Sequence, residues 1–436
     1  MNSMSCILKK ICIFTLTFIL SLSLLSNAED YVKIGLKYGS SSVGSCTLSS
    51  QAMLTICSNG EYISQDVLNS VTIKAENGLI SIYSTDSAPL YITLSKEQSV
   101  EILSSDGICS LDGKKYRGTF IFTINENGLI QVVNYLETEE YLKSVVPSEM
   151  PGAWNIEALK AQAVCARNYT YLNKNRYSKY GFDMDSTTAC QAYNGVTSEY
   201  PNSTQAVEET KGQILFYNNS PAELFYSSSS GGYTEDVKNV WGSTNYPYLI
   251  SVNDPYDNNY TWEVTFTKQE IKDRVEKLAK PIGDIVNVEI TQKTDALRAK
   301  EVVITGTEGT HTLKLESTRN FFNLKSAMYE IIPSNGVTKT VTPEVNYVDV
   351  LTAKGMEKRE LTAPILTKSG IIESLPTVTQ NAVTAQNSDS YTFKGKGYGH
   401  GIGMSQYGAK GFADNGYTYE QILAHYFPGT VLGNAE

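Results

Sequence analysis

The sequence predicts an α+β protein in which a mainly β region precedes a mixed domain of helices and strands. Residues 31–133 contain short strand-like runs separated by turn residues. From residue 134 onward, helical segments with capping residues alternate with further strands. Hydrophobic residues are 41% of the 436 residues and charged residues 19%, so the chain can bury a core and wholesale disorder is excluded.

The charge balance argues against a nucleic acid partner. Lys and Arg total 36 and Asp and Glu total 46, which gives a net charge of −10. Duplex nucleic acids select a basic surface, which this chain does not have overall. The three histidines, His311, His400 and His425, lie far apart in the sequence, so a His-rich metal site is not expected.

The N-terminus indicates export. Lys9 and Lys10 precede an apolar run over 11–25, which a small-x-small segment ending at Ala28 follows. This order is typical of a secretory signal peptide over residues 1–28, and its retention as a membrane anchor is the alternative. The predicted location is therefore extracytoplasmic: secreted, in the cell wall or anchored to the membrane.

Five cysteines follow the signal segment: Cys46, Cys57, Cys109, Cys165 and Cys190. An odd number leaves at least one thiol outside intrachain pairs. Cys46 and Cys57 could flank a hairpin and pair, but a disulfide-dependent fold is not indicated.

The β region contains two candidate hairpins. The predicted strands are 71–74, 79–83, 120–124 and 129–133. Asn77-Gly78 lies between the first two, and Asn127-Gly128 lies between the others. Asn-Gly pairs favour two-residue turns that need positive φ.

Two helices are predicted around a proline-flanked glutamate. The first covers 136–146 and ends before Pro147, since Pro147 and Pro151 should hold Glu149 out of a helix. The second starts after Asn155, a favourable N-cap, and runs to about Tyr177.

The remaining elements are predicted more coarsely. Residues 212–250 have strand character, 269–280 are helical, and 285–304 form a hairpin. A Thr-, Ser- and Asn-rich stretch at about 336–390 is predicted to be an insertion, part strand and part loop. A last helix is expected at 419–426.

Glu149 is the candidate acid. Its neighbours Val145, Val146, Met150 and Trp154 are apolar, and an apolar setting raises the pKa of a carboxyl group, as a general acid requires. An ordinary surface glutamate in a turn is the alternative.

His400 lies in the glycine-rich block 395–408 and could donate to a sugar hydroxyl or to a leaving oxygen. A buried histidine that bonds to backbone is the alternative. The serine run before Gly231 lacks the Gly-x-Ser-x-Gly elbow, which argues against a serine hydrolase. Cys165 lies among small helical residues and is expected to be structural.

Three blocks in this order resemble the stage II sporulation protein D / amidase-enhancer family over roughly residues 130–430. The blocks are 140–151 (EYLKSVVPSEMP) continuing into 157–164 (EALKAQAV), 226–234 (YSSSSGGYT) and 399–409 (GHGIGMSQYGA). The resemblance implies a mixed catalytic domain at 134–433 with a glycan groove. The β-rich region 31–133 precedes the matching blocks, and we expect it to be an accessory module for wall binding or partner contact.

The resemblance also implies an activity, because family members that are enzymes are lytic transglycosylases of peptidoglycan. They cleave the MurNAc-GlcNAc backbone, here expected in peptide-free strands, and leave 1,6-anhydro-MurNAc ends. Glu149 matches the catalytic glutamate of the family. The residues expected to bind or support substrate are Lys160, Gln162, Tyr226, Ser227, Gly231, Gly232, His400, Ser405, Gln406 and Tyr407.

One carboxylate suffices for this chemistry, whereas a hydrolytic glycosidase normally needs two. The alternative function is a non-catalytic amidase enhancer that binds glycan. The expected partners are peptidoglycan glycan strands and a cell-wall amidase or endopeptidase. Some relatives hold zinc beside a Cys-Gln-x-Tyr segment, but no histidine precedes Cys190 nearby, so no metal and no other cofactor is expected.

Overall fold

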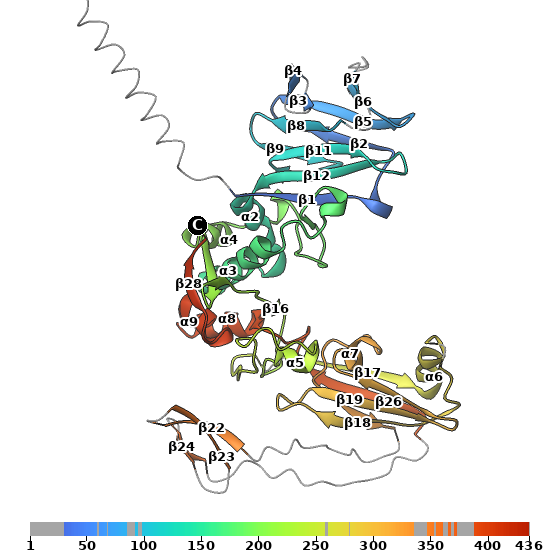
Figure 1. Ribbon diagram of the computed structural model, residues 1–436, viewed down its shortest axis with the longest axis vertical. Helices are drawn as coiled ribbons and strands as arrows, with labels where there is room; N and C mark the ends of the chain where they lie inside the picture. Colours follow the sequence, from blue (N-terminus) through green and yellow to red (C-terminus); the bar gives the residue numbers. More distant parts are fainter. Residues whose placement is uncertain are drawn as a thin grey trace, which may run out of the picture. The chain divides into compact units, whose positions relative to one another are not determined.

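The computed structural model describes residues 30–58, 61–67, 69–84, 92–94, 98–257, 260–278, 280–334, 347–352, 355–360, 365–367, 370–372 and 388–435. The predicted signal peptide or anchor at 1–28 lies outside these residues, as does most of the predicted insertion at 336–390. The fold is α+β, as predicted (Figure 1). None of the helices in the described ranges is long and apolar enough to cross a membrane.

The chain divides into two compact units, which are described separately. Unit 1 comprises residues up to 152 together with 170–211, and unit 2 comprises 153–169 together with 212–436. The predicted boundaries at 31–133 and 134–433 stay predictions.

Unit 1 contains two sheets. In the first, the strand order is β13 (Met184–Asp185), β1 (Tyr31–Lys37), β12 (Ile130–Glu137), β11 (Thr119–Ile124), β8 (Val100–Ser104), β3 (Leu54–Ser58) and β4 (Glu61–Val67). In the second, it is β10 (Lys114–Arg117), β9 (Ile108–Leu111), β2 (Ser45–Ser49), β5 (Ser70–Glu76), β6 (Leu79–Ser84) and β7 (Ile92–Leu94).

Alternating side chains form the core of these sheets. Val71 and Ile73 in β5 are fully buried, as are Phe120 and Phe122 in β11, while the residues between them are partly exposed. This period of two is the pattern that predicted strands in the sequence. Elements of the two sheets contact each other, β6 with β11 and β8 with β9.

One predicted hairpin turn is confirmed and the other is wrong. Asn77 and Gly78 have φ of 53° and 76° and join β5 to β6 as a two-residue turn. The β11–β12 pairing ends at Ile124 opposite Ile130, so that loop has five residues. Asn125 organises it, because its side-chain oxygen accepts from the backbone N–H groups of Asn127 and Leu129.

Short helical segments complete unit 1. They are η1 (Gly39–Ser41), α2 (Thr138–Glu149), η2 (Ser178–Tyr180), η3 (Val196–Ser198) and α4 (Pro201–Glu209).

Helix α3 (Ile156–Leu172) begins where the sequence predicts, with the Asn155 side-chain oxygen accepting from the Glu157 N–H at 3.1 Å. It ends five residues before the predicted Tyr177. A separate turn, η2, follows and is closed by Gly181 at φ 81°.

Unit 2 contains several small sheets. They are β15 (Ser220–Pro221), β14 (Gln213–Tyr217) and β28 (Val431–Asn434); β16 (Tyr226–Ser227) with β27 (Met404–Ser405); β17 (Thr261–Thr267), β26 (Ser390–Lys396) and β21 (Tyr329–Pro333); and β18 (Ile285–Lys293), β19 (Ala299–Gly306) and β20 (Thr310–Lys314). Two hairpins lie within the predicted insertion, β22 (Tyr347–Thr352) with β23 (Gly355–Glu360) and β24 (Ile365–Thr367) with β25 (Gly370–Ile372).

The helices of unit 2, besides α3, are α5 (Val237–Val240), α6 (Lys268–Glu276), α7 (Ser317–Asn320), α8 (Gln406–Asp414) and α9 (Tyr419–Tyr426). The predicted hairpin at 285–304 and the predicted helices at 269–280 and 419–426 are confirmed within a few residues. The sequence did not predict α8.

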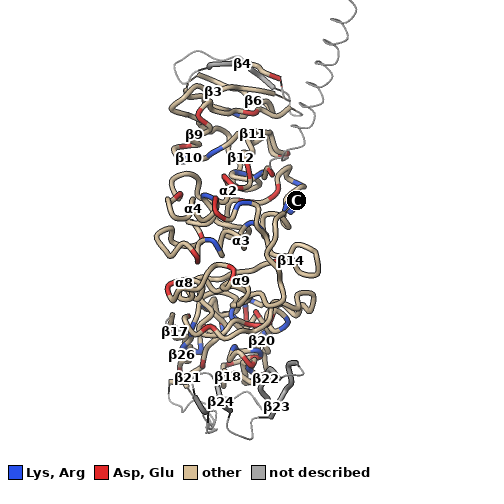
Figure 2. The backbone as a smooth tube through the Cα atoms, turned by 90° about the vertical axis from the view of Figure 1, so that its left-hand side faces the viewer, with Lys and Arg blue, Asp and Glu red and all other residues tan. Residues whose placement is uncertain are grey.

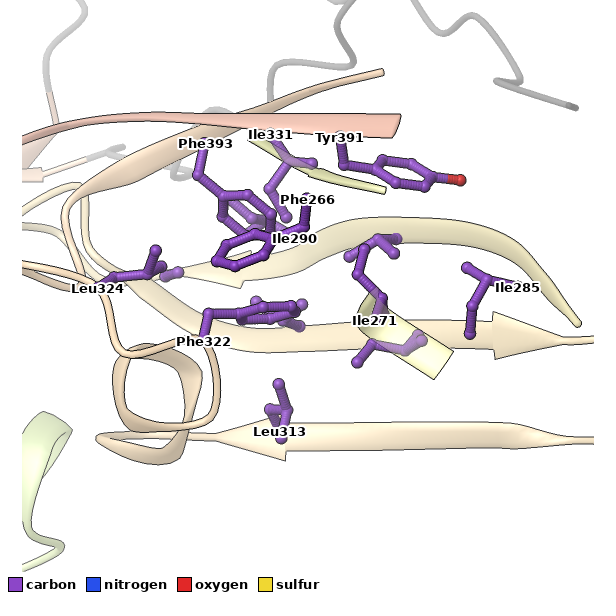
Figure 3. Packing of buried hydrophobic residues seen from close by; sticks show 14 of the residues in the cluster. Phe266, Ile271, Ile285, Ile290, Leu313, Phe322, Leu324, Ile331, Tyr391 and Phe393 are labelled. Carbon is purple, nitrogen blue, oxygen red and sulfur yellow. The ribbon is translucent and has the colours of Figure 1, made fainter. Parts of the chain in front are cut away.

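An aromatic cluster fills the core between β17, β26 and the segment after α7 (Figure 3). Phe322 and Phe393 lie 4.6 Å apart between ring centroids, and Phe266 lies 5.6 Å from each of them. All three are almost fully buried, so this cluster holds together α6 and the two sheets β17-β26-β21 and β18-β19-β20.

Candidate active site

Glu149 is the last residue of α2, and it is half-buried. Its Oε1 atom accepts a hydrogen bond from the backbone N–H of Ala192 at 2.9 Å. This bond fixes the carboxylate at the C-terminal end of the helix, and a fixed position is what a group that transfers a proton needs.

The predicted separation of Glu149 from the helix is wrong, because α2 continues through Pro147. Two bonds support the last turn despite the missing proline N–H. The Ser148 hydroxyl donates to the Ser144 carbonyl at 2.8 Å, and the Met150 N–H donates to the Val146 carbonyl at 2.9 Å. The helix, rather than a rigid extended segment, therefore orients the glutamate.

The segment that holds Glu149, residues 190–194, is anchored at several points. The Asn194 amide donates to the Ser148 hydroxyl at 3.1 Å. The Tyr193 hydroxyl donates to the side-chain oxygen of Asn134 at 2.7 Å, and its ring lies 5.0 Å from that of Tyr141. Sequence reasoning singled out this segment only for metal binding and missed its contact with Glu149.

The two acidic residues that precede this segment, Asp183 and Asp185, accept hydrogen bonds from other parts of unit 1. Asp183 accepts from the N–H groups of Lys33 and Asn175, at 2.8 and 3.0 Å. Asp185 accepts from the hydroxyls of Tyr38 and Tyr177. Among the described residues, no group of three or more His, Cys, Asp or Glu side chains could hold a metal ion.

In unit 2, the second and third sequence blocks meet in a short parallel pairing. Strand β16 pairs with β27, with Tyr226 opposite Met404 and Ser227 opposite Ser405. Ser229 exchanges two backbone hydrogen bonds with Tyr398, at 3.0 and 2.8 Å. The structure thus brings together two blocks that lie about 170 residues apart in the sequence, while Glu149 belongs to unit 1.

Glycines make this close approach possible. A Cβ atom on Gly399 would lie 2.5 Å from that of Ser227, and one on Gly231 would lie 3.0 Å from the Gly397 nitrogen. Gly231 and Gly232 both have positive φ, of 78° and 113°. These two predicted substrate residues shape the backbone of the second block.

The other predicted residues of the third block lie at the start of α8. Ser405 is buried and caps the helix, since its hydroxyl accepts from the Gly408 N–H at 3.1 Å. The Gln406 amide faces the buried Gln162 oxygen of α3 at 3.5 Å. Tyr407 is 45% exposed, and its ring lies 5.0 Å from that of Trp154.

Lys160 in α3 is engaged within unit 2. Its Nζ lies 2.8 Å from the Glu157 carboxylate, which also accepts from the Tyr419 N–H at 2.8 Å. The lysine ammonium is 5.6 Å from the centroid of the Tyr419 ring. The roles in substrate binding assigned to Lys160 and to the other residues of unit 2 stay predictions.

His400 packs against aromatic rings. Its Nδ1 accepts from the Ile402 N–H at 3.0 Å, and its ring centroid lies 5.3 Å from that of Trp241. Burial, together with Arg319 and Arg298, lowers the pKa of His400 to about 4. The imidazole is therefore neutral at pH 7, so a role as a cationic acid is not supported.

A buried acidic pair, which sequence reasoning missed, joins the second and third blocks. Asp257 accepts from the hydroxyls of Ser229 and Ser405. Asp254 accepts from the hydroxyls of Ser230 and Tyr426, both at 2.9 Å. Burial, followed by the neighbouring Asp257, raises the pKa of Asp254 to about 7.

This shift predicts how the stability of unit 2 depends on pH. The pKa of Asp254 in the folded state exceeds its ordinary value of 3.8. The stability that Asp254 contributes to unit 2 is therefore fully present below about pH 4 and is lost as the pH rises through about 7. The difference corresponds to at most about 4 kcal/mol in the free energy of unfolding. We expect Asp254→Asn to weaken this dependence, as measured by urea unfolding at about pH 5 and about pH 8.

Tryptophan fluorescence is a suitable signal, since Trp154, Trp241 and Trp262 all belong to unit 2. Equal losses of stability between the two pH values in Asp254→Asn and in the unsubstituted protein would contradict this assignment. The shifts of His400 and of the other histidines are present in both proteins and cancel in the comparison.

A second buried charge, Arg298, supports the same blocks. Its Nη2 donates to the carbonyls of Ser230 and Tyr233, at 2.7 and 3.0 Å. Its Nε lies 3.9 Å from the carboxylate of Glu235, which is also buried. A Cβ on Gly401 would lie 2.2 Å from this guanidinium group, so the arginine also requires glycine in the third block.

Comparisons with known proteins agree with the sequence blocks. A family model described as "Stage II sporulation protein" matches residues 126–217, a segment that includes Glu149 and the residues that hold it. The amidase enhancer of Bacillus subtilis (strain 168) is 35% identical over 341 residues, which are 76% of this chain and 46% of that relative. The chain thus spans about half the length of that protein.

Two further relatives are covered over most of their length. Stage II sporulation protein D of Bacillus subtilis (strain 168) is 30% identical over 70% of this chain and 77% of the relative. The protein of the same name from Bacillus amyloliquefaciens is 30% identical over 70% of this chain and 76% of the relative. The chain belongs to the stage II sporulation protein D / amidase-enhancer family.

Proposed function

We propose that the protein is a peptidoglycan lytic transglycosylase that cleaves the MurNAc-GlcNAc backbone of peptide-free strands during sporulation or cell-wall remodelling. The observation that supports this most is the Glu149 carboxylate, which lies at the end of α2 and accepts from Ala192 within the segment that matches the family. On this proposal the protein acts outside the cytoplasm. Glu149 serves as both the catalytic acid and the catalytic base.

The reaction balances with one carboxyl group. Protonated Glu149 gives its proton to the glycosidic oxygen as the bond from that oxygen to C1 of MurNAc breaks. The C6 hydroxyl oxygen of the same MurNAc forms the new bond to C1, and its proton passes to the Glu149 carboxylate. The product end is 1,6-anhydro-MurNAc, and the acid is restored.

The internal nucleophile explains why no second carboxylate is required. A hydrolytic glycosidase uses its second acid as nucleophile or to activate water. Here the nucleophile is already part of the substrate, so positioning replaces that activation.

The second candidate function is a non-catalytic amidase enhancer, which the name of the 35% identical relative favours. On this alternative the chain binds glycan and raises the rate of a cell-wall amidase that removes stem peptides. Glu149 would then only bind a sugar hydroxyl.

One experiment separates the two candidates. The purified full chain is incubated with peptide-free glycan strands alone, and separately with peptide-bearing walls and an amidase. A lytic transglycosylase releases soluble fragments from the strands without a partner. Release that depends on the amidase, with intact strands in its absence, would support the enhancer instead.

A further inference from the structure

The β region of unit 1 reaches the segment that holds Glu149. Gly195 has a φ of 74°, and a Cβ on it would lie 2.1 Å from the Lys115 carbonyl oxygen of β10. The chain that follows Ala192 therefore runs directly against this edge strand. The ring of Tyr116 in the same strand lies 5.5 Å from that of Tyr193.

Strand β10 is fixed in this place by an ion pair. Arg117 donates two hydrogen bonds of 2.7 Å to the carboxylate of Glu199, and its Nε lies 3.3 Å from the carboxylate of Glu140 in α2. Paired hydrogen bonds of this kind fix direction as well as distance. These contacts, to Glu199 and to the first turn of α2, give β10 a well-defined position within unit 1.

The first residue of this strand, Lys114, presents an exposed positive charge beside the site. Its Nζ donates to the Asn194 side-chain oxygen at 3.3 Å, and the Asn194 amide donates to Ser148, next to Glu149. Ala192 and Asn194 are two residues apart, so their Cα atoms lie within about 7 Å. Within the described ranges Lys114 forms no ion pair, unlike Arg117 in the same strand.

An unneutralised ammonium at this position fits an anionic group of the substrate. When a stem peptide is attached, the lactyl carboxyl group of MurNAc is a neutral amide. Once the peptide is removed, the same group is a carboxylate. It is carried by the sugar whose glycosidic bond is to be cleaved, so it and the reacting bond arrive together.

We propose that Lys114 binds the lactyl carboxylate of peptide-free MurNAc and so positions this sugar at Glu149. This inference rests on the proposed function. It makes the β region part of the substrate site and makes Lys114 a specificity-determining residue. It also supplies a physical reason why peptide-free strands would be preferred.

Binding tests this without turnover. The full chain carrying Glu149→Gln is titrated with peptide-free strands, and the same chain is prepared with Lys114→Met or with Lys115→Met. We expect Lys114→Met to weaken binding roughly tenfold at low salt, because a charge-assisted hydrogen bond is lost. Lys115 is the matched control, since its exposed side chain points to the opposite face of the strand.

A second substrate isolates the carboxylate. When the lactyl carboxyl groups are chemically reduced to alcohols, Lys114 has no carboxylate to bind. The parent that retains Lys114 should then bind these strands as weakly as Lys114→Met does. Equal affinity of Lys114→Met and the parent for peptide-free strands would overturn the inference and leave the proposed function intact. Failure of the parent to bind any glycan would overturn both.

Discussion

Glu149→Gln should lower the rate of glycan cleavage by roughly 10²–10⁴-fold while the fold persists. Glutamine keeps the side-chain oxygen that accepts from Ala192, so the end of α2 should be unchanged. It carries no transferable acidic proton, so neither protonation of the leaving oxygen nor recovery of the hydroxyl proton can occur. The measurement is the initial rate at which soluble fragments are released from peptide-free strands.

Glu139→Gln provides a matched control, because it makes the same change in the first turn of the same helix. We expect it to cleave at nearly the unsubstituted rate. A Glu149→Gln protein that cleaves within about threefold of this control would remove Glu149 from the mechanism and leave only a binding role.

Arg298→Met should destabilise unit 2 by about 3–5 kcal/mol, because it removes the buried cation that lies beside the buried Glu235 carboxylate. The carbonyls of Ser230 and Tyr233 would also lose their donor. Since these residues flank Gly231 and Gly232, the second block should lose its fixed conformation. Urea unfolding followed by tryptophan fluorescence measures the change.

Two further variants sharpen this test. Adding Glu235→Gln to Arg298→Met removes the buried carboxylate that Arg298→Met leaves unpaired with arginine. The double variant should therefore lose less stability than the sum of the losses in the two single variants. Lys314→Met removes an exposed lysine whose ion pair with Glu301 should contribute at most about 1 kcal/mol. If Arg298→Met were no more destabilising than Lys314→Met, the buried pair would not support the blocks.

The sequence predicted the elements whose causes are local. The Asn77-Gly78 turn and the Asn155 cap depend on a few neighbouring residues, so both were recognised. Helix α8 was missed because Gly408 and Gly411 lower its intrinsic helix propensity. A Cβ at these positions would lie 2.3 Å from Asp254 and 2.4 Å from Tyr256, so the glycines serve packing that no local pattern reveals.

The candidate site was predicted in part for the same reason. The Glu149 block was found because its motif is contiguous, but the effect of Pro147 was overestimated. Asp254 and Asp257 flank a Pro-Tyr pair in a polar segment and resemble an ordinary surface turn in the sequence. Only the tertiary fold buries them against Ser405 and Tyr426.

The most direct test of the central claim is to digest peptide-free strands with the full chain in water enriched in oxygen-18. The masses of the products are then measured by mass spectrometry. If the C6 hydroxyl of MurNAc is the nucleophile and Glu149 handles its proton, the new MurNAc ends are 1,6-anhydro sugars. These are one water lighter than hydrolysed ends and contain no heavy oxygen. New ends that are reducing sugars carrying the heavy isotope would show that water attacks, and would contradict the account.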